Sequence, residues 1–193
     1  MLENIKHYNL LLASNSPRRR ELLSGLGISY TVVTLPEIDE SYPAHLKGVE
    51  IPSFIAQKKA SAYQEMMSDD TMLITADTIV WLDGKVYGKP QDVNDARRML
   101  QELSGRTHTV ITGVAITTKE RQKVFAVESK VTFAKLDEDE IDYYVSEYKP
   151  MDKAGAYGIQ EWIGYIGVTS LEGSYFNVMG LPIQRLYNEL KQW

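Results

Sequence analysis

The stretch YNLLLASNSPRRRELL, residues 8–23, decides the fold because it joins an apolar run to a helix through a short polar loop. Residues 8–13 predict a buried strand. Ser16 and Pro17 are typical of the N-cap and of the first position of a helix. A glycine at position 25 or 27 would end that helix, as glycines at C-termini do. The stretch therefore predicts strand, tight loop and helix in direct succession.

Three arginines, Arg18, Arg19 and Arg20, fall in the first turn of this helix. The first turn carries partial positive charge and unpaired N–H groups, so each cation there is unfavourable by about 0.3–1 kcal/mol. The conflict disappears if an anion is bound, with backbone N–H groups, guanidinium groups and the hydroxyls of Ser14 and Ser16 converging on phosphate oxygens. On this hypothesis only bound phosphate offsets the penalty. The alternative is a solvated basic turn.

Composition limits the classes of protein to consider. The chain has 193 residues, 44% of them apolar, which is enough for one domain over residues 1–193 with a substantial core. A formal net charge of −5 argues against general affinity for nucleic acid. The lack of cysteine excludes disulfides and a cysteine nucleophile, and the three histidines lack metal-ligand spacing. Without a signal-peptide pattern or an apolar run near ~20 residues, we expect a cytoplasmic protein that binds no membrane.

Strand and helix patterns alternate along the rest of the chain. Strands are predicted over residues 30–35, 71–82, 107–116 and 124–136, and the second of these is either one long bent strand or a strand pair. Helices are predicted from Pro52, with a stripe of Ile55, Lys59, Tyr63 and Met66, and after Asp92, Asp137 and Pro182. Asp83-Gly84 is a strong hairpin signal after the second of these strands. The alternation of strands and helices predicts an α/β class, and the consecutive strands favour a mixed β-sheet with flanking helices.

Acidic residues supply the first candidates for chemistry. Asp77 interrupts the apolar strand 71–82, where an unpaired carboxylate is costly to bury. It is therefore expected beside a metal, a cation or a water that it activates, and the alternative is an Asp that begins a turn or faces solvent. Glu37, Asp39 and Glu40 cluster after the second strand. They form either a solvated loop or ligands of Mg²⁺, which takes one or two carboxylates together with substrate phosphates.

Two lysines and a glutamine complete the candidate residues for binding and catalysis. Lys59 lies on the apolar stripe of its helix, and Lys89 follows a glycine in YGKPQD. Lysines ordinarily keep the ammonium in water, but with the arginines these two predict a clamp for a triphosphate. Gln160 ends DKAGAYGIQ, whose small residues permit close approach of a flat ligand. Its amide can both donate to and accept from a base edge, although an ordinary bulged strand also explains the segment.

The sequence resembles the Maf family of nucleoside triphosphate pyrophosphatases over nearly its whole length. The blocks LLASNSPRRRELL, ADTIV, GKP, LSGRTHTVITGV, DKAGAYGIQ and GSYFNVMGLP carry the resemblance in this order. It implies a mixed α/β fold with two lobes around a deep cleft, related to the inosine triphosphatase group. It also implies hydrolysis of a nucleoside triphosphate to monophosphate and pyrophosphate with a divalent cation (magnesium, manganese or cobalt), and leaves a homodimer open.

The resemblance assigns roles residue by residue. Phosphate binding falls to Ser14, Ser16, Arg18, Arg19, Lys59 and Lys89. Asp77 is the proton acceptor, Glu40 and Asp77 hold the metal, and Arg18, Thr78 and Gln160 govern base choice. The branch that acts on dTTP and UTP looks closest. The alternatives are the sister branch acting on 7-methyl-GTP and a role in cell division, as an inhibitor of septum formation through protein interaction. Asn15 and Thr75 stand where glycine is usual in the family, and neither change removes a functional side chain.

Overall fold

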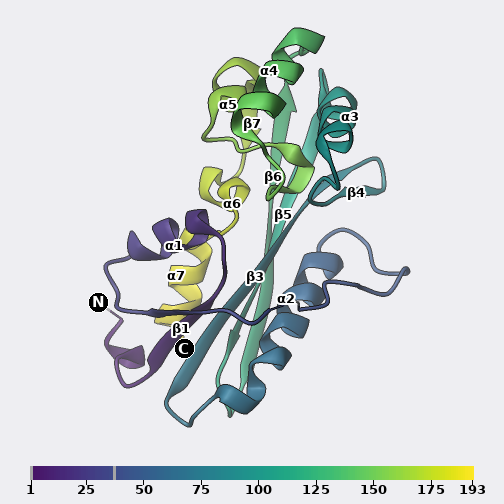
Figure 1. Cartoon of the computed structure of the whole chain (residues 1–193). Coiled ribbons are helices and arrows are strands. Elements are labelled where there is room, and N and C mark those ends of the chain that lie inside the picture. Colours follow the sequence, from purple (N-terminus) through teal and green to yellow (C-terminus); the bar gives the residue numbers. More distant parts are fainter. Residues whose placement is uncertain (1, 37) are drawn as a thin grey trace. The chain divides into compact units, whose positions relative to one another are not determined.

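The computed structural model describes residues 2–36 and 38–193 and contains a seven-stranded mixed sheet (Figure 1). The strand order is β2-β1-β3-β5-β6-β7, and β4 pairs with β3. β1 is parallel to β2 and β3, whereas β4 is antiparallel to β3 and β7 is antiparallel to β6. The strands are β1 (Asn9–Ala13), β2 (Thr31–Val33), β3 (Thr71–Leu82), β4 (Lys85–Tyr87), β5 (Thr107–Thr117), β6 (Gln122–Phe133) and β7 (Val168–Glu172). The predicted α/β class and mixed sheet are confirmed.

Three of the helices begin where the capping residues predict. The Ser16 side chain accepts from the Arg19 N–H, the Asp92 side chain accepts from the Asp95 N–H, and Asp137 forms a capping box with Glu140. The α-helices are α1 (Pro17–Ser24), α2 (Glu50–Ala62), α3 (Val93–Leu103), α4 (Glu138–Tyr148), α5 (Trp162–Gly167), α6 (Tyr175–Met179) and α7 (Ile183–Lys191). Single 3₁₀ turns are η1 (Glu3–Ile5), η2 (Gln64–Met66) and η3 (Ala154–Ala156).

Some details differ from the sequence prediction. α2 begins at Glu50, before Pro52, and ends before Met66, which is 58% exposed and does not extend the apolar stripe. The segment after residue 153 holds η3, α5, β7 and α6, for which no elements are predicted, because such short pieces show no helical or strand period. None of the helices in the described parts of the chain has both the length and the apolar character required to cross a membrane.

The chain divides into two compact units. The first comprises the chain up to Asp77, Thr112–Val127 and Gly180–Trp193, and the second comprises Thr78–Ile111 and Glu128–Met179. The boundary therefore falls inside β3, directly after Asp77. The deep cleft that the family resemblance implies stays a prediction. Within the first unit, α7 returns to the N-terminal segment (Figure 1). Asn4 Nδ2 there donates to the Leu190 carbonyl at 2.8 Å.

In the first unit, α2 packs closely on the sheet. Small and apolar side chains fill the contact between them: Ala13, Ala56, Ala60, Tyr63, Met67, Leu73 and Ala115. The buried Thr75 hydroxyl of β3 donates to the Ala56 carbonyl at 2.7 Å, which ties the helix to the strand. Gly113 of β5 lies under the start of α2, and a Cβ there would be 2.3 Å from the Pro52 carbonyl carbon. Close packing thus sets the position of the helix that carries Lys59.

Replacing Gly113 by Ala should destabilise the protein by about 1–3 kcal/mol or more, because the backbone of α2 has no room to retreat from the new methyl group. Urea unfolding measures the change. Gly88→Ala is the matched control, since a Cβ at Gly88 meets no atom within 4 Å and φ is not positive there. Equal stability of the two variants would contradict the packing described for Gly113.

Candidate functional site

The loop between β1 and α1 lies at the carboxyl end of a parallel strand pair. The register pairs Ala13 of β1 with Thr75 of β3, so Ser14 follows at the level where Ala76 and Asp77 continue β3. The Ser14 hydroxyl accepts from the Ser16 N–H at 3.1 Å. Loops at the carboxyl ends of parallel strands are common ligand sites. The register therefore brings the predicted phosphate loop to the part of β3 that carries the predicted catalytic carboxylate.

Arg19 and Arg20, at the start of α1, donate hydrogen bonds to backbone carbonyls. Arg19 Nε donates to the Gly180 carbonyl at 2.7 Å and Nη1 to the Ala76 carbonyl at 2.9 Å. Arg20 Nε and Nη2 donate to the Ser14 carbonyl at 3.3 and 3.2 Å. The expectation that only bound phosphate offsets these cations is therefore wrong for Arg19 and Arg20, because carbonyl groups of the fold accept their hydrogen bonds.

Arg19 also lies in the field of the carboxylates. Burial lowers the pKa of its guanidinium from the usual value, and the nearby Asp77 carboxylate acts in the opposite direction. The Glu40 carboxylate acts in the same direction as Asp77. Arg19 thus supplies a fixed positive charge beside both acids. Arg20, which the sequence interpretation left without a role, orients the loop through the Ser14 carbonyl; its only signal in the sequence is its place in the arginine run.

Lys59 brings the two predicted acids together. Its ammonium lies 2.8 Å from Asp77 Oδ1 and 2.8 Å from Glu40 Oε1. The Lys59 and Asp77 side chains are 13% and 11% exposed, and that of Glu40 is 43% exposed. The lysine predicted to bind phosphate therefore pairs with both predicted metal ligands in this structure.

The acidic loop after β2 is held on α2 by neighbours of Lys59. The Tyr63 hydroxyl accepts from the Leu35 N–H at 2.9 Å. Lys58 Nζ lies 2.6 Å from Asp39 Oδ2, and this contact holds the pKa of Asp39 well below its usual range. Asp39 thus pairs with Lys58, and Glu40 turns to Lys59. Glu37, the other acid of this predicted cluster, lies outside the described residues.

The chemistry of these acids fits a divalent metal that also binds substrate. Glu40 and Asp77 present two carboxylates to one point, which is the contribution that a protein typically makes to Mg²⁺ when phosphates and waters supply the remaining ligands. Among residues 2–36 and 38–193, no group of three or more His, Asp or Glu side chains is placed to hold a metal ion. The donors present therefore suit an ion that shares its coordination with phosphate.

The second unit carries Thr78, Lys89 and Gln160. Thr78 continues β3 directly after Asp77, and the exposed Lys89 follows β4. Gly155, in the turn before Gln160, donates its N–H to the Gly88 carbonyl at 3.0 Å. A Cβ on Gly155 would lie 2.8 Å from Val80 Cγ2, and its φ is +68°. Glycine at this position therefore lets the turn approach both β3 and the segment that leads to Lys89.

A buried polar network fixes the segment around Gln160. The Lys153 ammonium lies 2.8 Å from Asp152 Oδ1 and 3.3 Å from Glu161 Oε1. The Tyr144 hydroxyl donates to the Glu161 carboxylate and accepts from the Gly158 N–H at 2.9 Å. Burial, with Glu161 alongside, raises the pKa of Tyr144, so the phenol stays protonated. The sequence interpretation quoted Lys153 within its motif but missed this network, because the partners come from α4 and from the start of α5.

His108 anchors the same segment from β5. Its Nε2 is 2.7 Å from the Tyr157 hydroxyl, and Phe133 packs edge-on against both rings. Burial lowers the pKa of His108 from 6.5 to about 4, so the imidazole is neutral at pH 7. Burial also raises the pKa of Tyr157. The pair holds the backbone three residues before Gln160.

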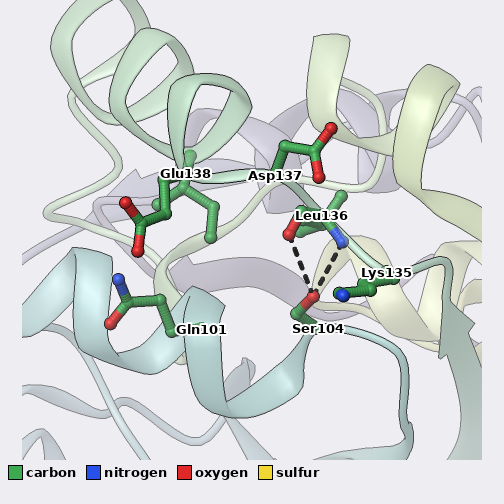
Figure 2. Close-up of a pocket in the computed structure, with 7 residues that line it drawn as sticks. Gln101, Ser104, Lys135, Leu136, Asp137 and Glu138 are labelled. Carbon is green, nitrogen blue, oxygen red and sulfur yellow. Dashed lines mark hydrogen bonds between the residues drawn. The ribbon is translucent and has the colours of Figure 1, made fainter.

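A separate depression lies in the second unit, where α3 ends beside the start of α4 (Figure 2). It has a volume of about 290 Å³ and is lined by Gln101, Ser104, Lys135, Leu136, Asp137, Glu138 and Ile141. Figure 2 shows hydrogen bonds between the Ser104 hydroxyl and the backbone of Leu136. The Leu136 N–H donates to Ser104 Oγ, with 2.7 Å between nitrogen and oxygen. None of the residues predicted for nucleotide binding lines this depression.

The neutral state of His108 predicts a dependence of stability on pH. Between pH 6.5 and about 4 the unfolded chain binds a proton that the folded protein does not, so stability falls as the pH falls. The loss attributable to His108 is on the order of 3 kcal/mol at the acid end. Urea unfolding from pH 7 to pH 4.5 should show a weaker pH dependence in His108→Gln. His45→Gln, which removes an exposed histidine, is the control; identical profiles for wild type and His108→Gln would contradict this account.

Comparison with known proteins identifies the family. The model of the Maf-like protein family matches residues 9–193. A protein of Phocaeicola vulgatus named dTTP/UTP pyrophosphatase is 64% identical over 192 residues, covering 100% of both chains. A protein of the same name from Parabacteroides distasonis is 58% identical, and the match covers 100% of both chains. Another from Flavobacterium psychrophilum is 47% identical, and the match covers 96% of this chain and 93% of its own.

Solved structures support the fold. The Staphylococcus aureus Ham1 protein aligns with a TM-score of 0.54 at 17% identity, covering 94% of this chain and 99% of its own. A HAM1 protein from Coxiella burnetii gives a TM-score of 0.54 at 15% identity, covering 96% and 100%. These two agree with the mixed α/β architecture, while the family match and the full-length relatives carry the assignment. The chain belongs to the Maf family.

Proposed function

We propose that this chain hydrolyses dTTP and UTP to the nucleoside monophosphate and pyrophosphate. Relatives that share 47–64% of its residues over almost the whole chain bear the name dTTP/UTP pyrophosphatase. The observation on this chain that carries the proposal is the contact of Lys59 with both Asp77 and Glu40 beside the Ser14–Ser16 loop. It combines a candidate proton acceptor with cations suited to phosphoryl oxygens.

The reaction adds water across the α–β phosphoanhydride. The water oxygen forms a bond to the α-phosphorus, the bond from that phosphorus to the bridging oxygen breaks, and pyrophosphate leaves with the electron pair. Asp77 is the proposed acceptor of the water proton. Its position on β3, in contact with the Lys59 ammonium and within the field of Arg19, supports this role.

Phosphoryl transfer depends mainly on positioning and on neutralising charge at the phosphoryl oxygens. The proposed groups are the hydroxyls of Ser14 and Ser16 and the cations of Arg18, Arg19, Lys59 and Lys89. For Arg19 the role is electrostatic, because Nε and Nη1 already donate to backbone carbonyls. Lys59 differs from Arg19 because its present partners, Glu40 and Asp77, are themselves proposed to act in the reaction.

A divalent cation completes the proposal. Glu40 and Asp77 are the proposed protein ligands of magnesium, for which manganese or cobalt would substitute. When bound, such an ion neutralises negative charge on the phosphates. Because Glu40 and Asp77 are the two acids proposed from the described residues, most of the coordination would come from the nucleotide and water.

Base choice is proposed to depend on Arg18, Thr78 and Gln160. Gln160 Oε1 is buried and has no hydrogen-bond partner within residues 2–36 and 38–193. A buried acceptor without a partner calls for an explanation. The N3–H that uracil and thymine share could donate a hydrogen bond to this amide oxygen. The Tyr144–Glu161 and His108–Tyr157 contacts, which hold the backbone around Gln160, support a role that requires fixed geometry.

A panel of triphosphates tests the function. Pyrophosphate release should be fastest with dTTP and UTP and slower with dCTP, GTP and 7-methyl-GTP. Preference for 7-methyl-GTP would move the chain to the sister branch. Absence of pyrophosphate release from every member of the panel would contradict the proposal.

Asp77→Asn should lower kcat by about 10²–10⁴-fold, because the amide cannot accept the water proton. Asp69→Asn is the matched control: it makes the same change at an exposed acid whose partner is the surface residue Lys119. Circular dichroism checks that both variants fold. An Asp77→Asn enzyme that retains wild-type kcat would remove Asp77 from the mechanism.

A further inference from the structure

We infer that Lys59 acts as a built-in counter-ion that occupies the Glu40–Asp77 carboxylate pair in the nucleotide-free protein and keeps free divalent metal weakly bound until a triphosphate draws the lysine away. This inference rests on the proposed function and deepens it, because it assigns an order to metal and nucleotide binding. It concerns three residues of the first unit alone.

The Lys59 ammonium is fully engaged by acceptors of the fold in the nucleotide-free protein. A lysine ammonium has three N–H donors. Lys59 Nζ lies 2.8 Å from Glu40 Oε1, 2.8 Å from Asp77 Oδ1 and 3.5 Å from the Ala76 carbonyl oxygen. Each of the three donors thus has an acceptor: two are on β3, at Ala76 and Asp77, and the third is Glu40 in the loop after β2. With Lys59 and Asp77 nearly excluded from water, this contact is stronger than a surface ion pair.

Lys59 and a divalent metal ion would compete for the same two carboxylates. A divalent ion bound to Glu40 and Asp77 would approach the same carboxylates that now accept from Lys59. Two cations held at one carboxylate pair repel each other strongly where water is scarce. The lysine must therefore leave before the metal binds tightly. An ammonium that leaves without a new partner is an uncompensated charge in a mostly buried place.

The neighbouring cation explains why Lys59 is the one that moves. Arg19 is fixed by its bonds to the Gly180 and Ala76 carbonyls, so its charge stays beside the acids. Lys59 ends a flexible four-carbon stem, and its ion-pair partners among the described residues are the two carboxylates that it would exchange. The phosphates of a nucleotide supply the replacement acceptors. Metal and nucleotide then strengthen each other's binding, as thermodynamic linkage requires.

Binding of Mn²⁺ to the nucleotide-free protein tests the inference without any turnover. Electron paramagnetic resonance of unbound Mn²⁺ gives the dissociation constant. Lys59→Met, which keeps the stem and removes the charge, should bind Mn²⁺ at least about tenfold more tightly than wild type. Lys59→Arg, which keeps the charge, should stay within about threefold of wild type.

Lys58→Met is the matched control, because it removes a positive charge from the adjacent residue, whose partner is Asp39. It should leave the Mn²⁺ affinity unchanged. Adding Glu40→Gln to Lys59→Met should abolish the gain. A gain that persists in the double variant would place the ion elsewhere and overturn the inference.

Lys59→Gln is a second neutral variant with the same expectation, and circular dichroism checks that each variant folds. Equal Mn²⁺ affinity of wild type and both neutral variants would overturn the inference. If wild type still releases pyrophosphate from dTTP in that case, the proposed function stands. If wild type hydrolyses no triphosphate but the neutral variants bind Mn²⁺ more tightly, the function fails and the competition at the carboxylates stands.

Discussion

The ammonium of Lys59 joins three segments that lie far apart in the sequence: the last turn of α2, the loop after β2 and the middle of β3. Without the Lys59 ammonium, the Asp77 carboxylate would lie in a largely apolar strand with one compensating positive charge fewer. Burying a carboxylate with less compensating charge costs free energy. Close packing of α2 on Gly113 and the Thr75–Ala56 hydrogen bond bring the lysine there. The fold and the candidate chemistry thus depend on the same contact.

Local signals predicted the framework well. Ser16 with Pro17, Asp92, and Asp137 with Glu140 mark helix starts through bonds that reach only three residues along the chain. Asp83-Gly84 predicts the turn after β3, and both residues have positive φ, at 49° and 80°. Asp77 was recognisable because a carboxylate inside an apolar strand requires a partner.

The unpredicted features depend on partners distant in sequence. Arg19 bonds to carbonyls 57 and 161 positions away, so no local pattern distinguishes it from an arginine that waits for phosphate. The Lys153–Glu161–Tyr144 network forms only when α4 packs beside the glycine-rich turn. Local pattern likewise predicted Lys59 as a cation for phosphate, whereas its acidic partners come from a loop and a strand that only the fold brings to it.

On the proposed mechanism, Lys59 exchanges its carboxylate partners for phosphates when substrate binds. A crystal structure with Mn²⁺ and a dUTP analogue whose α–β bridge cannot be hydrolysed tests it most directly. We expect Lys59 Nζ within hydrogen-bond distance of a phosphoryl oxygen, with Glu40 and Asp77 turned to the metal. Bound phosphates with Lys59 still bonded to both carboxylates would contradict it.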